Sequence, residues 1–413
     1  MSTSDRRRFL RRSAGLAAAT LATARAATSA ADPVPDAVPE WTRTPGHPIL
    51  RPPYGERSYH ETGIVRIPIP GRVNTMSSAS LTPLQDMRGI VTPSGLVFER
   101  HHGGVPDIPP HEHRLLVHGL VARPLVFGME ELMRFPSVSR MHFLECSGNT
   151  AGEWKGKGGT VQVTHGLLSC CEWTGVPLAV VLQETGIDPR AQWLLAEGAD
   201  AAAMTRSIPI EKALDDAMLV YAQNGEMLRP EQGYPLRLLL PGFEGNASVK
   251  WLRRIKVGTA PFMTREETSK YTDLMPDGTA RQFTLTMEAK SVILRPSGGQ
   301  QVRGPGFVEI QGVAWSGRGR ITRVDVSVDG GRSWRAAQLQ EPVLTKCLTA
   351  FRVPWQWNGA PAVLQSRAVD ETGYMQPTRS QLIAARGLDS YYHYNAIQSW
   401  QLAADGAVTN VHA

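Results

Sequence analysis

The chain has 413 residues and a formal net charge of +6, and this length suffices for two or three domains, each with its own core. A charge of +6 spread over the chain would favour a nucleic-acid or anionic-membrane partner. Residues 1–31, however, carry six arginines against one aspartate and account for +5 of it. Without that segment the remainder is nearly neutral, which excludes a basic mature protein.

The segment 1–31 has the layout of an export signal. A charged head (Arg6–Arg12) precedes a short run of small and apolar residues (Ala14–Ala24), and Ala24-Arg25-Ala26 is typical of a cleavage site. Paired arginines, a spacer and Phe-Leu resemble a twin-arginine signal, which exports folded, often cofactor-loaded proteins. We therefore expect a periplasmic protein. No later run reaches the ~18 apolar residues of a membrane span, so we expect no anchor.

Residues 32–91 and 92–286 differ in composition and in apolar periodicity. Residues 32–91 are rich in proline and short of apolar periodicity, which predicts an extended arm. Over 92–286, strand-like and helix-like runs alternate, which predicts a mixed α+β domain. The expected strands are 114–119, 141–145, 235–240 and 251–257, and the expected helices are 130–135, 178–185 and 210–216.

In the C-terminal part of the chain, apolar and polar residues alternate strictly. Phe307–Trp315 and Ile321–Val328 alternate apolar and polar residues, and Asp329–Gly331 supplies the glycines of a tight hairpin. We expect an all-β, immunoglobulin-like sandwich over 287–390, followed by a tail over 391–413. It concentrates no chemistry, so we assign it a structural or interface role.

Four cysteines occur, and Cys146 stands apart from the other three. It follows a predicted strand and lies in a loop with Gly148. A thiol placed in this way is a nucleophile with His142 or His165 as its base, a soft-metal ligand, or an inert buried side chain. The chain contains no Cys-x-x-Cys-His motif, so we expect no covalently bound haem.

Two further groups of residues can bind ligands. His111 and His113 form a pair that suits zinc, but no third and fourth ligand follow at a recognisable spacing, so we expect no zinc site. Arg237 and Lys250 stand where glycine and proline turns meet strands. Such cations can hold a phosphate-bearing ligand, Arg as a fork and Lys as a point charge.

These motifs together resemble the sulfite oxidase family of molybdenum enzymes, over about residues 97–387. Leu144–Asn149 fits the family's Leu-x-Cys-x-Gly-Asn motif, and Arg100–His102 fits its Arg-x-His motif. Gly233–Arg237 and Lys250–Leu252 fit its pterin-phosphate motifs. Asp325–Gly331 resembles part of its dimerisation domain.

The resemblance implies molybdenum-molybdopterin as cofactor, with Cys146 as the thiolate ligand of the metal. Arg100 would neutralise the anionic sulfur species. Tyr271, twenty residues after Trp251 as in the family, would hydrogen-bond at the metal and manage protons. Arg352, from the second domain, would reach the substrate pocket. The remaining cofactor contacts are expected at His102, Asp200, Arg237 and Lys250.

Several positions differ from the pattern of the family's sulfite oxidases and indicate which subgroup of the family the chain resembles. Thr150-Ala151 stands where the family's sulfite oxidases have two arginines of an anion pocket, and Gln232 stands where histidine is usual. We expect no cytochrome b5-like domain before the molybdenum domain. The chain most resembles the molybdenum subunits of periplasmic sulfane (sulfite) dehydrogenases of the bacterial Sox thiosulfate-oxidising system. This implies oxidation of sulfite or carrier-bound sulfane sulfur and a c-type cytochrome acceptor, in a homodimer within a hetero-oligomer.

Two alternatives remain open. One is a periplasmic molybdopterin methionine sulfoxide reductase, although such enzymes lack the C-terminal sandwich that we expect here. The other is a haemless adaptor that binds a cytochrome through the sandwich and carries no molybdopterin.

Overall fold

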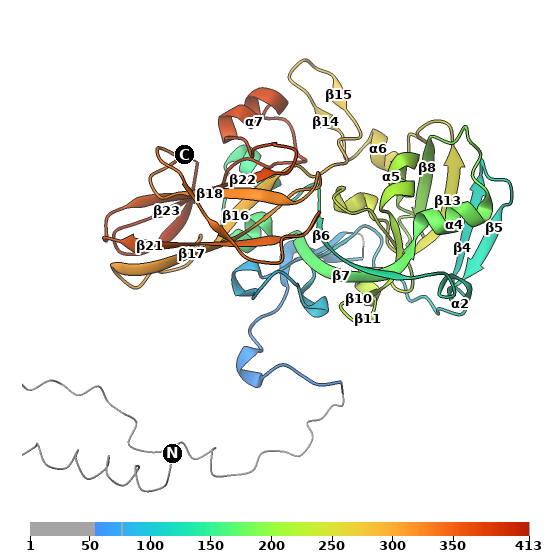
Figure 1. Cartoon of the computed structure of the whole chain (residues 1–413), viewed down its shortest axis with the longest axis horizontal. Helices are drawn as coiled ribbons and strands as arrows, with labels where there is room; N and C mark the ends of the chain where they lie inside the picture. The colour runs from blue at the N-terminus through green and yellow to red at the C-terminus, as the bar shows by residue number, and fades with distance from the viewer. Residues whose placement is uncertain (1–53, 76, 413) are drawn as a thin grey trace, which may run out of the picture. The chain divides into compact units, whose positions relative to one another are not determined.

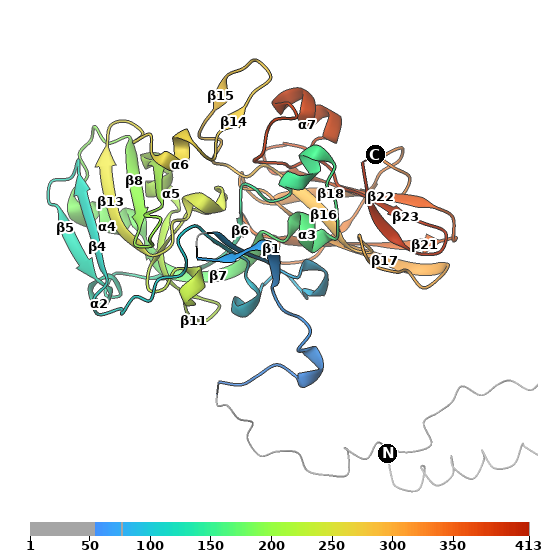
Figure 2. The same cartoon turned by 180° about the vertical axis from the view of Figure 1, so that it is seen from behind.

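The computed structural model describes residues 54–75 and 77–412. The export signal and the first part of the arm, up to residue 53, lie outside these ranges. His60–Ala413 forms one compact unit (Figures 1 and 2). Within the described ranges, no helix combines the length and apolar character that a bilayer span requires.

The arm contributes strands to the fold. β1 (Ile67–Asn74), β2 (Ser77–Leu81) and β3 (Glu99–His101) form a three-stranded antiparallel sheet, with Ala79 opposite Arg100. The proline-rich part of the predicted extended arm, residues 32–53, lies outside the described residues. Pro68 and Pro70 lie in β1, at the edge of this sheet, where proline is tolerated. The arm therefore positions the segment that carries Arg100.

The central domain contains two sheets. The first has the order β11-β10-β7-β6, with β12 pairing β10, and the second has the order β5-β4-β13-β8-β9. Aliphatic side chains of both sheets and of α4 form one buried core. The strands are β4 (Arg114–Gly119), β5 (Leu125–Gly128), β6 (Val138–Glu145), β7 (Leu168–Pro177), β8 (Trp193–Gly198), β9 (Thr205–Pro209), β10 (Met218–Gln223), β11 (Glu226–Met227), β12 (Arg237–Leu239) and β13 (Leu252–Gly258).

Short helices connect these strands, so the domain has the expected mixed α+β class. α4 follows directly on β7, and α5 directly on β9, with a proline just before each helix. The helices are α2 (Met129–Leu132), α3 (Val161–His165), α4 (Leu178–Thr185), α5 (Ile210–Asp215) and α6 (Arg265–Thr268).

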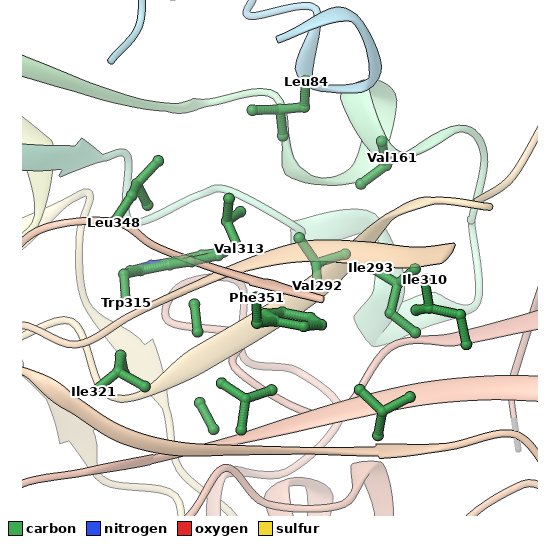
Figure 3. Packing of buried hydrophobic residues seen from close by; sticks show 14 of the residues in the cluster. Leu84, Val161, Val292, Ile293, Ile310, Val313, Trp315, Ile321, Leu348 and Phe351 are labelled. Carbon is green, nitrogen blue, oxygen red and sulfur yellow. The ribbon is translucent and has the colours of Figure 1, made fainter. Parts of the chain in front are cut away.

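The C-terminal domain is a sandwich of two antiparallel sheets, with the orders β16-β17-β21-β20 and β19-β18-β22-β23-β24. Alternating apolar residues of both sheets meet in its core (Figure 3). The strands are β16 (Lys290–Arg295), β17 (Gly306–Trp315), β18 (Ile321–Ser327), β19 (Arg335–Ala336), β20 (Gln338–Leu339), β21 (Thr349–Trp357), β22 (Ala362–Asp370), β23 (Ser399–Leu402) and β24 (Val408–Val411).

The segment 391–413 is more than a tail, because β23 and β24 extend the second sheet of the sandwich. Trp400 and Leu402 of β23 are fully buried in the core and alternate with a partly exposed residue. A small hairpin, β14 (Asp273–Leu274) and β15 (Ala280–Arg281), precedes the sandwich, and α7 (Arg379–Arg386) follows β22.

The two domains share buried surface. Phe143 of β6 and Leu168 and Cys170 of β7 belong to the same apolar cluster as the sandwich core. Polar contacts accompany them: His142 Nδ1 lies 3.2 Å from the carbonyl oxygen of Lys346 in the loop before β21. Burial lowers the pKa of His142 from 6.5 to about 4, so this imidazole is neutral in the folded protein at pH 7.

This burial predicts acid sensitivity at the domain boundary. The unfolded chain binds a proton at His142 below pH 6.5 and the folded chain binds it only near pH 4, so stability falls as pH falls between these values. Between pH 7 and pH 5, His142 should contribute a loss of about 2 kcal/mol. Urea unfolding at both pH values checks this, with His142→Asn as reference. An equal loss in the variant would contradict the assignment.

Candidate active site

A cavity of about 670 Å³ lies in the central domain and gathers residues that are far apart in the sequence. Its lining includes seven residues singled out by the sequence, namely Arg100, His102, Cys146, Asp200, Arg237, Lys250 and Tyr271. Arg352 is not among the residues lining it in this chain, contrary to our expectation. It lies in β21, where its Nε donates a hydrogen bond to Gln338 Oε1 at 3.0 Å.

Cys146 lies directly after β6, in a tight loop whose backbone is hydrogen-bonded. Its N–H donates to the carbonyl of Leu167 at 3.0 Å, and its own carbonyl accepts from Asn149 N–H at 2.9 Å. Gly245 allows the opposite wall to approach, since a Cβ there would lie 2.9 Å from the carbonyl oxygen of Glu145. Burial raises the pKa of the Cys146 thiol. A bound cation would reverse this and hold the thiolate.

A buried carboxylate fixes this loop from behind. Glu145 Oε1 accepts hydrogen bonds from Lys290 Nζ at 3.0 Å and from Asn149 Nδ2 at 2.9 Å. Glu145 Oε2 accepts from Trp315 Nε1 at 2.6 Å, and Lys290 Nζ also donates to Thr150 Oγ1 at 2.8 Å. Lys290 and Trp315 belong to the sandwich, so the second domain holds the loop that carries the thiol.

Two buried cations line the same cavity. Arg237 Nη1 donates to the carbonyl of Gln232 at 3.2 Å, while its buried Nε has no hydrogen-bond partner among the described residues. Lys250 Nζ donates to the carbonyl of Glu231 at 3.0 Å and lies 2.6 Å from His101 Nδ1. Burial lowers the pKa of Arg237 to about 10 and that of Lys250 well below its usual range. Cations desolvated in this way fit an anionic group such as a phosphate.

Local backbone geometry brings these two cations together. Gly233 has φ of +107°, and a Cβ there would lie 3.1 Å from Lys250 Cβ, so glycine permits the approach. Gln232 donates to the carbonyl of Phe98 at 3.0 Å and lies against Arg237. Gln232 therefore helps to orient Arg237. Asp200 Oδ1 accepts a hydrogen bond from Met204 N–H at 3.3 Å, which closes the adjoining turn.

Arg100, His102 and Tyr271 form another part of the lining. Tyr271 Oη lies 3.3 Å from His102 Nε2. Burial and the nearby Arg100 lower the pKa of His102 to about 4, and burial raises that of Tyr271. At neutral pH the phenol is therefore protonated and the imidazole is neutral, so Tyr271 donates this hydrogen bond when the His102 proton is on Nδ1. Arg100 Nη1 donates to the carbonyl of His101 at 2.6 Å.

Arg206 of β9 (Thr205–Pro209) lies against the ring of Tyr271, and no sequence motif marks it. Its guanidinium lies 5.0 Å from the centre of the Tyr271 ring, a cation–π contact. Arg206 Nη2 donates to Glu244 Oε1 at 2.8 Å, and Glu267 lies within 3.5 Å. Burial alone would raise the pKa of Glu244, but Arg206 and His393 lower it to about 2.

A second hollow of about 840 Å³ adjoins the cavity and shares His102, Met204 and Tyr271 with it. Exposed Arg265 and Lys270 stand on its rim. A Cβ at Gly103 would lie 2.5 Å from the backbone nitrogen of Ala202, so glycine is needed where the walls approach. Tyr271 and His102 therefore lie between this hollow and the cavity.

The histidine pair that suits zinc does not form a site. His111 is exposed, whereas His113 is buried and its Nε2 lies 2.9 Å from the carbonyl oxygen of Leu252. Across residues 54–75 and 77–412, no group of three His, Cys, Asp or Glu side chains is placed to hold a metal ion. A metal with cysteine as its single protein ligand needs no such group.

Comparison with known proteins defines the class. Residues 102–266 match the oxidoreductase molybdopterin binding domain, and residues 281–399 match the Mo-co oxidoreductase dimerisation domain. Mitochondrial sulfite oxidase of Mus musculus is 32% identical over 338 residues, covering 74% of this chain and 61% of that protein. Sulfite oxidase of Gallus gallus is 34% identical over 295 residues, covering 65% and 63%. The chain thus spans about three fifths of the length of these curated relatives.

The fold agrees with a solved structure as well. The crystal structure of the sulfane dehydrogenase SoxCD from Paracoccus pantotrophus is 46% identical, with a TM-score of 0.90, and the match covers 92% of this chain and 99% of that one. The fold and the domain matches define a molybdopterin-binding oxidoreductase. The chain belongs to the sulfite oxidase family, as its motifs predict. The cavity fits the family's cofactor, because it offers one thiol to a metal and two buried cations to a phosphate.

The anchoring of the thiol loop can be tested at Lys290. In Lys290→Met the buried Glu145 loses its cation, which should cost about 3–5 kcal/mol in unfolding free energy. The purified variant should also retain less molybdenum, since the Cys146 loop loses its support. Differential scanning calorimetry and metal analysis check this, with the exposed Lys155→Met as the matched control. Wild-type stability and metal content in the Lys290 variant would refute the anchoring.

Proposed function

We propose that the chain is the molybdenum-containing component of a dehydrogenase for sulfite or carrier-bound sulfane sulfur in thiosulfate oxidation. The observation that carries the proposal is the convergence of Cys146, Arg100 and Tyr271 with the two buried cations on one cavity. The 46% identity to a sulfane dehydrogenase over 92% of the chain supports the substrate class.

The roles of the residues follow from their chemistry. Cys146 would ligate molybdenum, and Arg237 and Lys250 would hold the pterin phosphate, with His102 and Asp200 beside it. When bound, this cofactor supplies the two-electron redox chemistry that no side chain can perform. Arg100 is placed to pair with negative charge on a sulfur–oxygen group, an electrostatic contribution.

Tyr271 would donate a hydrogen bond within the cavity. The raised pKa of Tyr271 keeps the phenol protonated, and the low pKa of His102 keeps the imidazole 3.3 Å away neutral. The proton therefore stays on Tyr271 and is not transferred to His102. The aromatic ring is held by Arg206, which keeps the hydroxyl at a fixed position in the cavity.

The choice between free and carrier-bound substrate rests on the charges of the lining. Thr150, at one of the positions where the family's sulfite oxidases have arginine, accepts a hydrogen bond from Lys290 and supports the thiol loop. Among the described residues lining the cavity, Arg100 is the arginine beside Tyr271 and His102. A small free anion is bound mainly by charge-assisted hydrogen bonds, so it would be held weakly. A substrate attached to a carrier protein would gain further binding contacts outside the cavity. This consideration favours carrier-bound sulfane sulfur over free sulfite as the substrate.

The protein's setting is part of the proposal. The N-terminal pattern Arg6–Leu10 supports export by the twin-arginine route to the periplasm. The match of residues 281–399 to a dimerisation domain supports a homodimer. We propose that electrons leave singly to a c-type cytochrome subunit, since the sequence contains no haem-attachment motif of its own.

The substrate assignment is tested with the molybdenum-loaded protein and cytochrome c as acceptor. Sulfite and a thiosulfate-loaded carrier protein are compared, with and without the native cytochrome subunit. We expect a higher kcat/KM for the carrier. Arg100→Gln should lower kcat/KM about a hundredfold, equivalent to ~3 kcal/mol for one charge-assisted bond, while the exposed Arg303→Gln should match wild type. Faster turnover of free sulfite would overturn the sulfane assignment, and protein without molybdopterin would identify an adaptor.

Arg206 provides a test of the positioning of Tyr271. Arg206→Lys keeps a cation beside Glu244 but loses the planar contact with the ring, worth about 1–2 kcal/mol. We expect kcat to fall about tenfold with KM near that of wild type, and the melting temperature to fall by a few degrees because the buried ring contact is lost. Steady-state kinetics and calorimetry check this, with the exposed Arg253→Lys as control. An unchanged kcat would show that Tyr271 needs no such support.

A further inference from the structure

Two thiols outside the site face each other across the domain boundary. Cys170 lies in β7 of the central domain, and Cys347 lies just before β21 of the sandwich, 177 residues later. Their Sγ atoms are 3.3 Å apart, and the two residues are 0% and 1% exposed. Both belong to the apolar cluster shared by the two domains. The proposed chemistry uses neither of them.

The loop that carries Cys347 is held in place by the central domain. The carbonyl of Lys346 accepts a hydrogen bond from Phe143 N–H at 3.2 Å, and Lys346 Nζ donates to Asp216 Oδ2 at 2.5 Å. Lys346 N–H donates to the carbonyl of Gly319 at 3.1 Å, within the sandwich. Contacts from both domains thus fix the backbone next to Cys347, and the approach of the two sulfurs is part of the packed interface.

The neighbouring Cys171 does not compete for Cys347. Successive residues of a strand point to opposite faces of the sheet, and the Cys171 thiol lies 3.6 Å from the carbonyl oxygen of Thr92. Its Sγ accepts a hydrogen bond from Gln223 Nε2 at 3.3 Å, on the other face. Cys146 lines the cavity. Cys170 is therefore the specific partner of Cys347.

We propose that Cys170 and Cys347 form a disulfide that covalently joins the central domain to the sandwich when the protein meets an oxidising environment. Each thiol gives up its proton and one electron, and an Sγ–Sγ bond forms. The oxidant is another disulfide, such as oxidised glutathione or a protein thiol oxidant, which takes up two electrons and two protons and becomes two thiols. The inference goes beyond the proposed function, because it concerns neither substrate nor cofactor.

The distance and the burial define how this bond would form. A disulfide requires sulfurs about 2.05 Å apart, so small movements of two side chains within the existing core suffice. Cys170 and Cys347 are 0% and 1% exposed, so an external disulfide cannot reach either sulfur in the packed interface. Exchange therefore takes place while the interface is open, and the packed interface then protects the bond from reduction.

The test maps thiols in the full-length holoprotein. One sample is isolated from an oxidising compartment, and a second is incubated for days with oxidised glutathione. Both are denatured, alkylated without reductant, digested and examined by mass spectrometry. We expect a linked pair of peptides carrying Cys170 and Cys347, with Cys146 and Cys171 alkylated. Alkylation of both Cys170 and Cys347 in the two samples would overturn the proposal.

Variants separate this pair from other linkages. Cys347→Ser should remove the linked peptides, whereas Cys171→Ala should retain them. The melting temperature of the wild type should fall on treatment with reductant, and that of Cys347→Ser should not respond, because the bond restricts the unfolded chain. Linked peptides that vanish in Cys171→Ala, or an equal response of both proteins to reductant, would contradict the assignment.

Discussion

The buried carboxylate of Glu145 is the contact on which the candidate site depends. It lies one residue before Cys146 and is bound by Lys290 and Trp315 of the sandwich. Burying this ion pair costs desolvation free energy, which an apolar pair would avoid. The ion pair instead fixes the position of the thiol loop, because both oxygens of Glu145 and the ammonium of Lys290 form hydrogen bonds with specific partners. Hydrogen bonds from the second domain therefore help to hold the thiol loop in its geometry. The sandwich, which matches a dimerisation domain, thus takes part in building the site.

Charge in the interior follows a second constraint. Arg237 and Lys250 line the cavity with their cationic groups desolvated, and such groups are costly without an anion. Arg206, by contrast, is paired with Glu244 and Glu267, so it supports Tyr271 without attracting a ligand. The buried cations of this region are therefore of two kinds. Arg237 and Lys250 line the cavity and can bind an anionic cofactor group, whereas the charge of Arg206 is neutralised by Glu244 and Glu267. The overall charge of +6 resides mainly in residues 1–31 and has no part in this arrangement.

The sequence predicted the local elements and the motif residues well. The strand 114–119 and the helix 178–185 have the expected bounds, since their apolar patterns and flanking glycine or proline are local signals. The seven lining residues come from ordered motifs, so the family resemblance brings them together. Contacts between residues distant in the sequence were not predicted, because no local sequence pattern marks them. Lys290, Trp315 and Arg206 look like ordinary strand residues in the sequence. Arg352 also lies on a regular strand, and its place in β21 follows from pairing with β17 and β20.

Strands at the two ends were missed for a related reason. β1 and β2 contain proline or small polar residues, and they become regular by pairing with each other and, through β2, with β3. β23 and β24 have four residues each, which is too short to show a clear alternation of apolar and polar residues. They join the sheet by the pairing of β23 with β22, which lies well before them in the sequence. In both places the tertiary partner decides the structure.

Molybdenum K-edge X-ray absorption of the purified protein and of Cys146→Ser measures whether Cys146 is the single protein sulfur ligand of the metal. Fitting the extended fine structure should give one sulfur neighbour fewer in the variant than in wild type. An identical number of sulfur neighbours in the two proteins would contradict this ligation.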